Sequence, residues 1–148
     1  MSTDTHENNP HCDGKFGQIC WLEIPVTDVR RAIAFYRAVF DWCCKDESMP
    51  HPLDSIQAVH FFMNGTLNGA FLVMFPEDLV KTAGSKGSGR QSALATYCVA
   101  DIEETLRKVE KAGGAVIVPK TAIGGDMGSF ARFVDTDGNL QGIWDQTM

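Results

Sequence analysis

Val26-Thr27-Asp28-Val29 and Val99-Ala100-Asp101-Ile102 are two short stretches that match each other 73 residues apart, and they decide the expected fold. Each follows a β-rich segment and precedes an amphipathic helical pattern, and Ile33 falls on Leu106 at the same offset. The aspartate in each stretch is a residue type that caps the first turn of a helix. The sequence therefore predicts two copies of one structural unit.

Apolar periodicity and turn residues predict the same order of elements in both copies. In the first copy we expect strands at Gly17–Pro25, Ile56–Met63 and Ala70–Phe75, a helix over 29–40, and a shorter strand from Trp42. Turn chemistry lies at Asn64-Gly65 and Asn68-Gly69. In the second copy we expect strands at Ala93–Val99, Ala115–Val118, Phe130–Val134 and Leu140–Trp144, a helix from Ile102 to Gly113, and a hairpin turn at 135–139.

Each copy is therefore a βαβββ unit, and the fold class is α+β. Residues 1–15 are polar and are expected to form a disordered tail, and residues 16–80 form the first module. The Gly/Ser-rich segment 81–91 is a linker, and residues 92–148 form the second module. One helix leaves one face of a four-stranded sheet uncovered, so the two units must pack together or share a barrel.

Composition excludes several functional classes. The formal net charge of −6 argues against nucleic acid as a partner, because phosphate binding needs concentrated Lys and Arg. No apolar run approaches the roughly 20 residues that span a bilayer, and the first residues lack the apolar core of a signal peptide. The five cysteines include no CxxC pair, which is typical of reduced thiols. We therefore expect a cytoplasmic protein with no membrane partner.

Two local phrases add a resemblance. The order of elements resembles that of the vicinal oxygen chelate (VOC) superfamily. Two sequence motifs resemble it as well: one runs from Val26 and Asp28 to Phe35-Tyr36 and Phe40, and the other is Phe133-x-Asp135-x-Asp137-Gly138-Asn139. This superfamily includes the glyoxalase and bleomycin-resistance proteins. The likeness covers residues 17–146, so residues 16–146 together are expected to form one VOC domain of two tandem βαβββ modules with a curved sheet. The Trp-Leu-Glu strand and the closing strand are similar to the lactoylglutathione lyase-related branch.

The resemblance implies four metal-ligand positions on the strands, where a divalent ion chelates two substrate oxygens. In this sequence they fall on Trp21, Leu94, Gly142 and the stretch 71–74, and none carries a His or a carboxylate. We therefore predict no cofactor and no metal of the family type. The alternative is a divalent metal with rearranged ligands, using Glu23 and His60, the one carboxylate and the one imidazole on predicted strands.

Strand alternation predicts the residues of a ligand site. Trp21, Glu23 and Pro25 share one face of the first strand, and Leu94, Thr96 and Cys98 share the matching face in the second module. If these faces line a cavity, the ligand-binding residues are Trp21, Glu23, Thr96, Cys98 and Trp144, and the catalytic candidates are Glu23 and His60.

Structural alternatives exist for the same side chains. Glu23 could lie at a wet pocket mouth or pair with Arg132 instead of serving as a general base. His60 could be an ordinary hydrogen-bonded strand histidine, and Trp21 and Trp144 could be parts of the core or of a pocket wall.

Three functions follow from these observations. The first is binding of a small organic molecule without the family metal, with or without acid/base chemistry at Glu23. The second is a metal-dependent lyase, isomerase or dioxygenase of the glyoxalase type with rearranged ligands. The third is a non-catalytic interaction protein whose cavity is filled by side chains. Related proteins commonly pair, so we also expect a homodimer.

Overall fold

The computed structural model describes residues 16–82 and 92–147 of the chain. The tail expected over residues 1–15 and most of the linker expected over 81–91 lie outside the described residues. The elements of the first half are β1 (Leu22–Val26), α1 (Val29–Phe40), β2 (Cys43–Cys44), β3 (Ile56–Asn64), β4 (Leu67–Met74) and the 3-10 helix η1 (Pro76–Asp78). Those of the second half are β5 (Thr96–Cys98), α2 (Ile102–Lys111), β6 (Ala115–Ala122), β7 (Ser129–Val134) and β8 (Leu140–Asp145).

The strands form two four-stranded sheets with the same internal order, β1-β4-β3-β2 and β5-β8-β7-β6. In each sheet the strand before the helix pairs in parallel with the last strand, and the other neighbours are antiparallel. A parallel pair needs a long crossover, which the intervening helix supplies. The predicted α+β repeat of two βαβββ units is therefore confirmed.

The two helices begin in the same way. Asp28 accepts a hydrogen bond from the backbone N–H of Arg31 at 3.2 Å, and Asp101 accepts one from the N–H of Glu104 at 3.0 Å. Each carboxylate thus satisfies an N–H that has no partner within the helix. Thr27, the residue before this cap, uses its hydroxyl for a different contact, described below.

The hairpin between β3 and β4 corrects one expectation. Its loop is Gly65-Thr66, and Gly65 has a φ of 60°, whereas Asn68 and Gly69 belong to β4. A Cβ on Gly69 would clash with the backbone oxygen of Leu22 and lie 2.5 Å from the Phe62 ring. Gly69 therefore permits the close pairing of β4 with β1, and the prediction of a turn at this glycine is wrong.

Other strand boundaries also differ from those expected, and β4 runs from Leu67 to Met74 instead of from Ala70 to Phe75. β1 begins at Leu22 instead of Gly17, and β5 begins at Thr96 because alanine-rich residues before it favour strand structure weakly. β6 continues through Pro119 to Ala122, and its pairing with β7 shifts register on both sides of Val118. Proline is tolerated in an edge strand at such an irregularity, because no sheet hydrogen bond needs its missing N–H.

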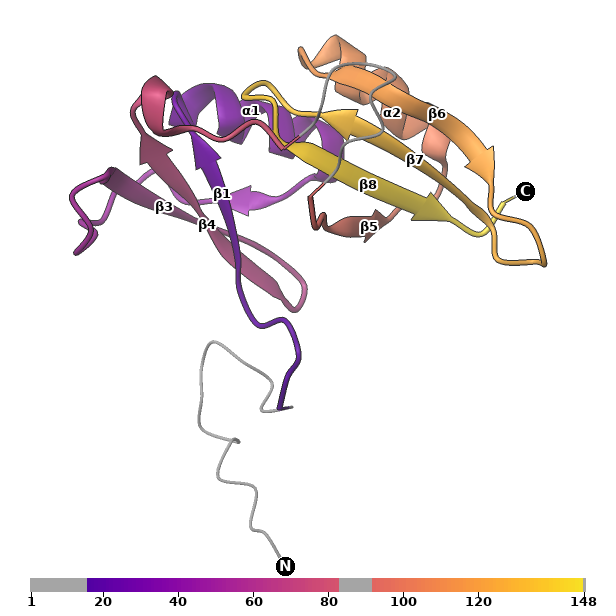
Figure 1. Ribbon diagram of the computed structural model, residues 1–148, viewed down its shortest axis with the longest axis horizontal. Coiled ribbons are helices and arrows are strands. Elements are labelled where there is room, and N and C mark those ends of the chain that lie inside the picture. The colour runs from indigo at the N-terminus through magenta and orange to yellow at the C-terminus, as the bar shows by residue number, and fades with distance from the viewer. Residues whose placement is uncertain (1–15, 83–91, 148) are drawn as a thin grey trace, which may run out of the picture.

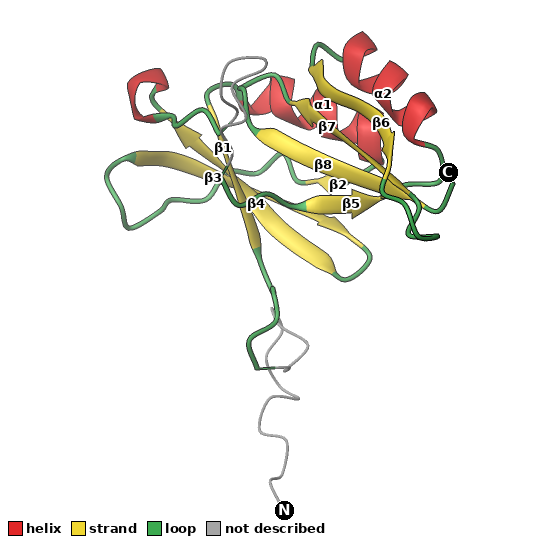
Figure 2. Ribbon diagram, turned by 45° about the vertical axis from the view of Figure 1, so that its right-hand side comes forward, coloured by secondary structure: helices red, strands yellow, loops and turns green. Residues whose placement is uncertain are grey.

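One hydrophobic core runs through both halves. Trp42 is 2% exposed and stacks on Tyr36 and Phe62, with ring centroids 4.6 Å and 4.4 Å away. Phe40 on α1 contacts Tyr97 on β5 at 4.7 Å, which joins the halves through aromatic packing. The helices α1 and α2 contact each other, and both lie on one side of the strands (Figures 1 and 2). Within residues 16–82 and 92–147, the opposite face of each sheet therefore carries no α-helix.

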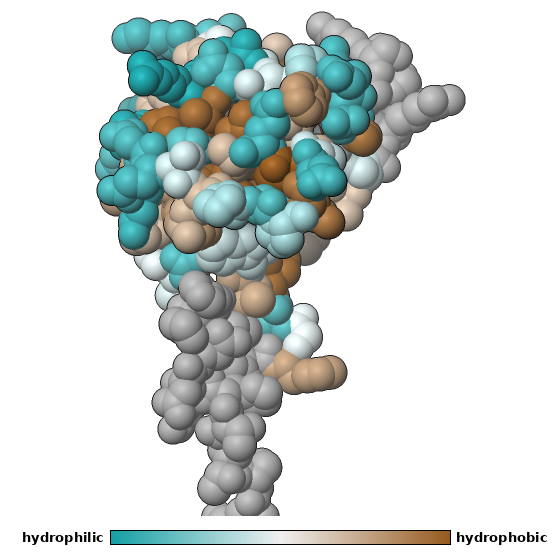
Figure 3. Space-filling view, turned by 90° about the vertical axis from the view of Figure 1, so that its left-hand side faces the viewer, coloured by the Kyte–Doolittle hydropathy of each residue, from teal (hydrophilic) through white to brown (hydrophobic). Residues whose placement is uncertain are grey.

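The chain before β1 leads away from this core (Figure 1). Phe16 and Ile19 in this segment are 99% and 87% exposed, and Figure 3 shows apolar side chains, in brown and tan, standing clear of the body beside the grey residues. Neither helix within residues 16–82 and 92–147 has the length and apolar character needed to cross a bilayer.

Candidate functional site

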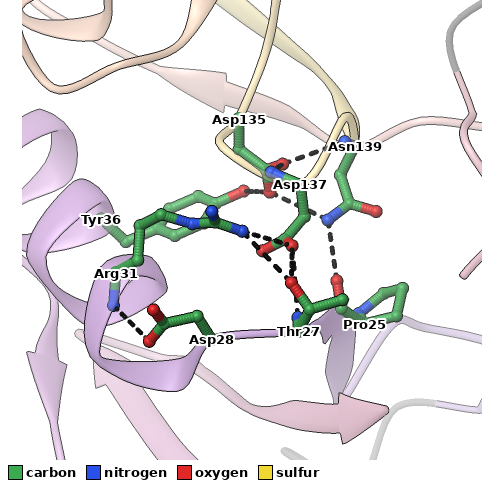
Figure 4. A network of polar contacts seen from close by, with 8 residues as sticks. All are labelled: Pro25, Thr27, Asp28, Arg31, Tyr36, Asp135, Asp137 and Asn139. Carbon is green, nitrogen blue, oxygen red and sulfur yellow. Dashed lines mark hydrogen bonds and ion pairs between the residues drawn. The ribbon is translucent and has the colours of Figure 1, made fainter. Parts of the chain in front are cut away.

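A buried polar network joins the two halves where β1 passes into α1 (Figure 4). The turn between β7 and β8 lies against this point. The Asn139 amide donates to the carbonyl oxygen of Pro25 at 2.9 Å, and the Thr27 hydroxyl donates to Oδ1 of Asp137 at 2.7 Å. The guanidinium of Arg31 lies 2.9 Å from the same carboxylate oxygen. These contacts fix the start of α1 to the second half.

Tyr36 is the centre of the buried part of the network. Its hydroxyl donates to Oδ2 of Asp135 at 2.7 Å and accepts from the Gln141 amide at 3.0 Å. The other oxygen of Asp135 accepts the backbone N–H groups of Asp137 and Asn139, each at 2.9 Å. Burial, and after it the negative charge of Asp135, raises the pKa of Tyr36 well above the ordinary value. Tyr36 therefore stays protonated and donates to the carboxylate.

This network explains the two phrases that resemble the VOC superfamily. The Phe35-Tyr36 pair on α1 and the Asp135–Asn139 turn are distant in sequence but meet in space. A buried hydrogen-bond network favours one arrangement of the groups that it joins, although Oδ2 of Asp137 makes no hydrogen bond to any described residue. Its role is to hold the two halves, and any cavity between them, in one geometry.

A crevice of about 630 Å³ opens between the two halves. Leu22 of β1, the end of α1 at Phe40, and Trp42 line it from the first half, and Leu94 and Tyr97 line it from the second. Concave sites with apolar and aromatic walls and few polar groups are the usual form of small-molecule sites. Residues of both halves are needed to form this one.

The polar groups of the crevice come from two edges. Asn64 and Thr66 belong to the end of β3 and its hairpin loop, and Thr96 and Cys98 belong to β5. The structure therefore places two of the predicted ligand-binding residues, Thr96 and Cys98, at the crevice.

The ring and the hydroxyl of Tyr97 lie in different surroundings. Its ring lines the crevice, whereas its hydroxyl is buried and makes no hydrogen bond within the described residues. Burial is the largest cause that raises the pKa of Tyr97 above the ordinary tyrosine value. The residue thus contributes an apolar surface and no ionisable group to the crevice.

Trp21 and Glu23 do not line the crevice. Leu22 points toward the core and the crevice, so Trp21 and Glu23 lie on the opposite face by strand alternation. Trp21 packs edge-on against Phe61 with ring centroids 5.8 Å apart. Glu23 is exposed beside buried Ala70 and makes no ion pair with Arg132. The single chain therefore does not bury the Glu23 carboxylate.

Trp144 lies on the second sheet, paired with Cys98 across β5 and β8. Its indole N–H donates to the carbonyl oxygen of Met127 at 2.7 Å, which ties β8 to the β6–β7 hairpin. The indole is thus engaged in a structural contact, and it does not line the crevice.

His60 and Glu23 are on opposite faces of the first sheet. His60 pairs with the core residue Phe71, and Glu23 pairs with Ala70, the next residue along β4. Neighbouring residues of a strand point to opposite faces, so one ion cannot contact both side chains. The structure brings His60 instead to the side of α1.

The residues at the family's metal positions do not fit a divalent ion. Trp21, Leu94 and Gly142 offer no ligating side chain, and the same holds for residues 71–74. A Cβ on Gly142 would lie 2.7 Å from the Thr96 hydroxyl oxygen and 3.0 Å from the Leu94 side chain. Neighbouring atoms therefore leave no room at position 142 for a metal-ligating side chain. Nowhere in the described ranges do three His, Cys, Asp or Glu side chains form a possible metal group.

Sequence reasoning missed the aromatic walls of the crevice. Phe40 was visible only as a core position of the α1 stripe, and Tyr97 lies on the face of its strand opposite to the one considered. The adjacent Trp42 begins the short strand region and gives no signal of a ligand site. All three needed the packing of one half on the other to become part of a site.

Comparisons with known proteins agree with this fold. Residues 18–142 match the model of the Glyoxalase/Bleomycin resistance protein/Dioxygenase superfamily. A glyoxylase-like domain-containing protein from Didymella fabae is 31% identical over 133 residues, covering 86% of this chain and 92% of that protein.

Two solved structures share the fold at low identity. A variant of the fosfomycin resistance protein FosX from Listeria monocytogenes, complexed with Mn(II) and a dihydroxypropylphosphonic acid, has a TM-score of 0.60 at 15% identity, covering 90% of this chain and 93% of that one. TnmS3, an antibiotic binding protein from Streptomyces sp. CB03234, has a TM-score of 0.55 at 16% identity, covering 88% and 96%. The repeat, the fold and the family match agree: this chain belongs to the glyoxalase/bleomycin resistance protein/dioxygenase superfamily, within the vicinal oxygen chelate group that its motifs predict.

Proposed function

We propose that this protein binds a small, largely apolar organic molecule in the crevice between its two halves, without the metal ion of the family. The observation that supports the proposal is the crevice itself, about 630 Å³ in volume and walled by Phe40, Trp42 and Tyr97. Thr96 and Cys98 supply the polar contacts from β5. The antibiotic-binding activity in the name of TnmS3 is consistent with such a role on this fold.

The experiment is ligand-observed NMR with a library of uncharged aromatic fragments. In the variant Leu94→Trp the indole fills the crevice, so fragments that bind the wild type should lose their signal changes. Leu53→Trp is the matched control, because Leu53 is 58% exposed and lies outside the crevice. Equal binding to the wild type and to Leu94→Trp would place the ligand elsewhere and refute the proposal.

We also propose a homodimer that covers the exposed outer faces of the sheets. Glu23 on the first sheet and Cys98 on the second are both exposed, and Phe16 and Ile19 present apolar surface to water. A second copy placed on these faces would enclose Trp21, Glu23 and Trp144. That enclosed space would be a second site, on the face opposite to the crevice, in which Glu23 serves as the polar anchor or general base of a ligand.

The cytoplasmic location expected from the sequence remains a prediction, and so does the absence of a cofactor. The metal-dependent alternative, a lyase, isomerase or dioxygenase that uses Glu23 on β1 and His60 on β3, would require one ion to bind from both faces of the first sheet. We therefore favour metal-free binding.

A further inference from the structure

A second hollow lies apart from the crevice, in a groove of about 540 Å³ between α1 and the strand region around β2 and β3. It shares no lining residue with the crevice. Its apolar wall is formed by Ile33 and Ala34 of α1, and its charged groups come from the same helix and from the residues after β2. The groove is therefore separate from the crevice.

Two arginines of α1 line this groove. Arg30 and Arg37 are seven residues apart, about 10 Å along a helix and on the same side of it. Within residues 16–82 and 92–147 neither is in an ion pair, although the chain has a net charge of −6. Arg37 uses one nitrogen to donate to the carbonyl oxygen of Cys44 at 2.9 Å, which leaves its other N–H groups for a ligand. The neighbouring Arg31, by contrast, is held by Asp137.

His60 adds a buried polar group to the same groove. It is 8% exposed and lies on the helix-facing side of β3. Its Nδ1 is 3.4 Å from the carbonyl oxygen of Lys45, and its Nε2 makes no hydrogen bond to any described residue. Although the residue as a whole is buried, this nitrogen keeps access to the groove, so water or a ligand can meet it there. This second observation distinguishes the groove from a helix surface that merely carries arginines.

From these contacts we propose that the groove is an oxyanion-binding site, in which Arg30, Arg37 and His60 bind the carboxylate or phosphate group of a small molecule. Guanidinium groups bind both oxyanions through charge-assisted hydrogen bonds, and Ile33 and Ala34 accept a short carbon body. Asp46, also at the groove and without an ion pair in the described chain, repels a second negative group and accepts a hydroxyl or ammonium donor.

The test is an NMR titration of the full chain with inorganic phosphate and, separately, with acetate. Each titration is compared with sodium chloride at the same ionic strength. Saturable shifts are expected at the His60 imidazole and at the backbone amides of residues 29–37. A response to phosphate alone, to acetate alone or to both supports the site and identifies the group that it prefers.

Variants decide whether the arginines bind the ion. Arg30→Gln and Arg37→Gln should each weaken binding about tenfold, the usual effect of losing one charged hydrogen bond. Arg107→Gln is the matched control, since Arg107 is an exposed arginine of α2 outside the groove, and it should change nothing. Thermal melting confirms that each variant is folded.

Three outcomes would overturn the proposal. The chemical shifts could change linearly without saturation, sodium chloride could reproduce them, or they could persist unchanged in Arg30→Gln and Arg37→Gln. Because Leu94→Trp closes only the crevice, it should leave phosphate and acetate binding intact. Failure of the proposed function and failure of the oxyanion site are therefore distinguishable.

Discussion

Asp145 is fully buried at the end of β8 and ties three parts of the second half together. Its carboxylate accepts the backbone N–H of Ile102 at 2.8 Å, and the backbone N–H and hydroxyl of Thr147 at 3.0 Å and 2.7 Å. Burial alone raises its pKa, but the hydrogen bonds from Thr147 and Ile102, with the charge of Lys120, outweigh burial and lower the pKa below 3.8. The charged form therefore stabilises the fold.

The first prediction concerns acid stability. The pKa of Asp145 is lower in the folded chain than in the unfolded chain, so its charged carboxylate stabilises the fold in full above about pH 4. This contribution to the unfolding free energy is lost as the pH falls through the pKa of the folded chain. Asp145→Asn should cost about 1–3 kcal/mol of unfolding free energy at pH 7, and less at pH 3. Urea unfolding at both pH values measures this, with exposed Asp54→Asn as the control. A cost that does not change with pH would show that the charge is irrelevant.

The second prediction concerns Glu23, whose carboxylate is exposed in the single chain. Glu23→Gln keeps the shape and removes the charge, so the unfolding free energy should change by no more than about 0.5 kcal/mol. If the enclosed dimer site forms on the outer faces, binding or turnover of a ligand held there should weaken. Melting temperature and fragment binding measure the two effects. Loss of more than about 2 kcal/mol with unchanged binding would make Glu23 a structural residue.

At the scale of elements, the Tyr36 hydroxyl makes the buried part of the contact between α1 and the β7–β8 turn, beside the partly exposed Arg31–Asp137 ion pair. Tyr36→Phe removes the partner of Asp135 and Gln141 and leaves both buried without it. The third prediction is a loss of about 1–3 kcal/mol in unfolding free energy, measured with urea.

The matched control for this prediction is Tyr97→Phe. It removes a buried hydroxyl that has no hydrogen bond in the described part of the chain, so stability should stay constant or rise. If the two variants cost the same, aromatic packing and not the hydrogen bond would join the elements.

At the scale of the whole molecule, the exposed outer faces lead to the fourth prediction, a homodimer. Light scattering at tens of micromolar should give about twice the chain mass of 16.2 kDa. The exposed apolar side chains Phe16 and Ile19, in the segment before β1, also favour association. A particle near 16.2 kDa would refute this assembly.

The fifth prediction concerns metal. Protein incubated with Ni, Zn, Mn or Fe and then desalted should retain well under one equivalent, since three or four protein ligands are usual for a catalytic site. The metal content is measured by elemental analysis of the desalted protein. A stoichiometric ion that Glu23→Gln and His60→Gln both release would contradict the placement of these residues on opposite faces of the sheet.

The sequence by itself determined the repeat, the helix starts at Asp28 and Asp101, the turn at 135–139 and the superfamily. These features follow from local propensity, short-range hydrogen bonds and periodicity, which a chain displays before it packs. Strand alternation likewise separates Leu22 from Trp21 and Glu23.

Only the tertiary structure decided which of those faces meets the other half. Leu22 lines the crevice, while Glu23 lies on the outer face and His60 lies beside α1. Tyr36 likewise finds Asp135 only when the second half packs against α1. The physical reason is that periodicity tells which side chains share a face, whereas the direction of that face depends on the packing of distant segments.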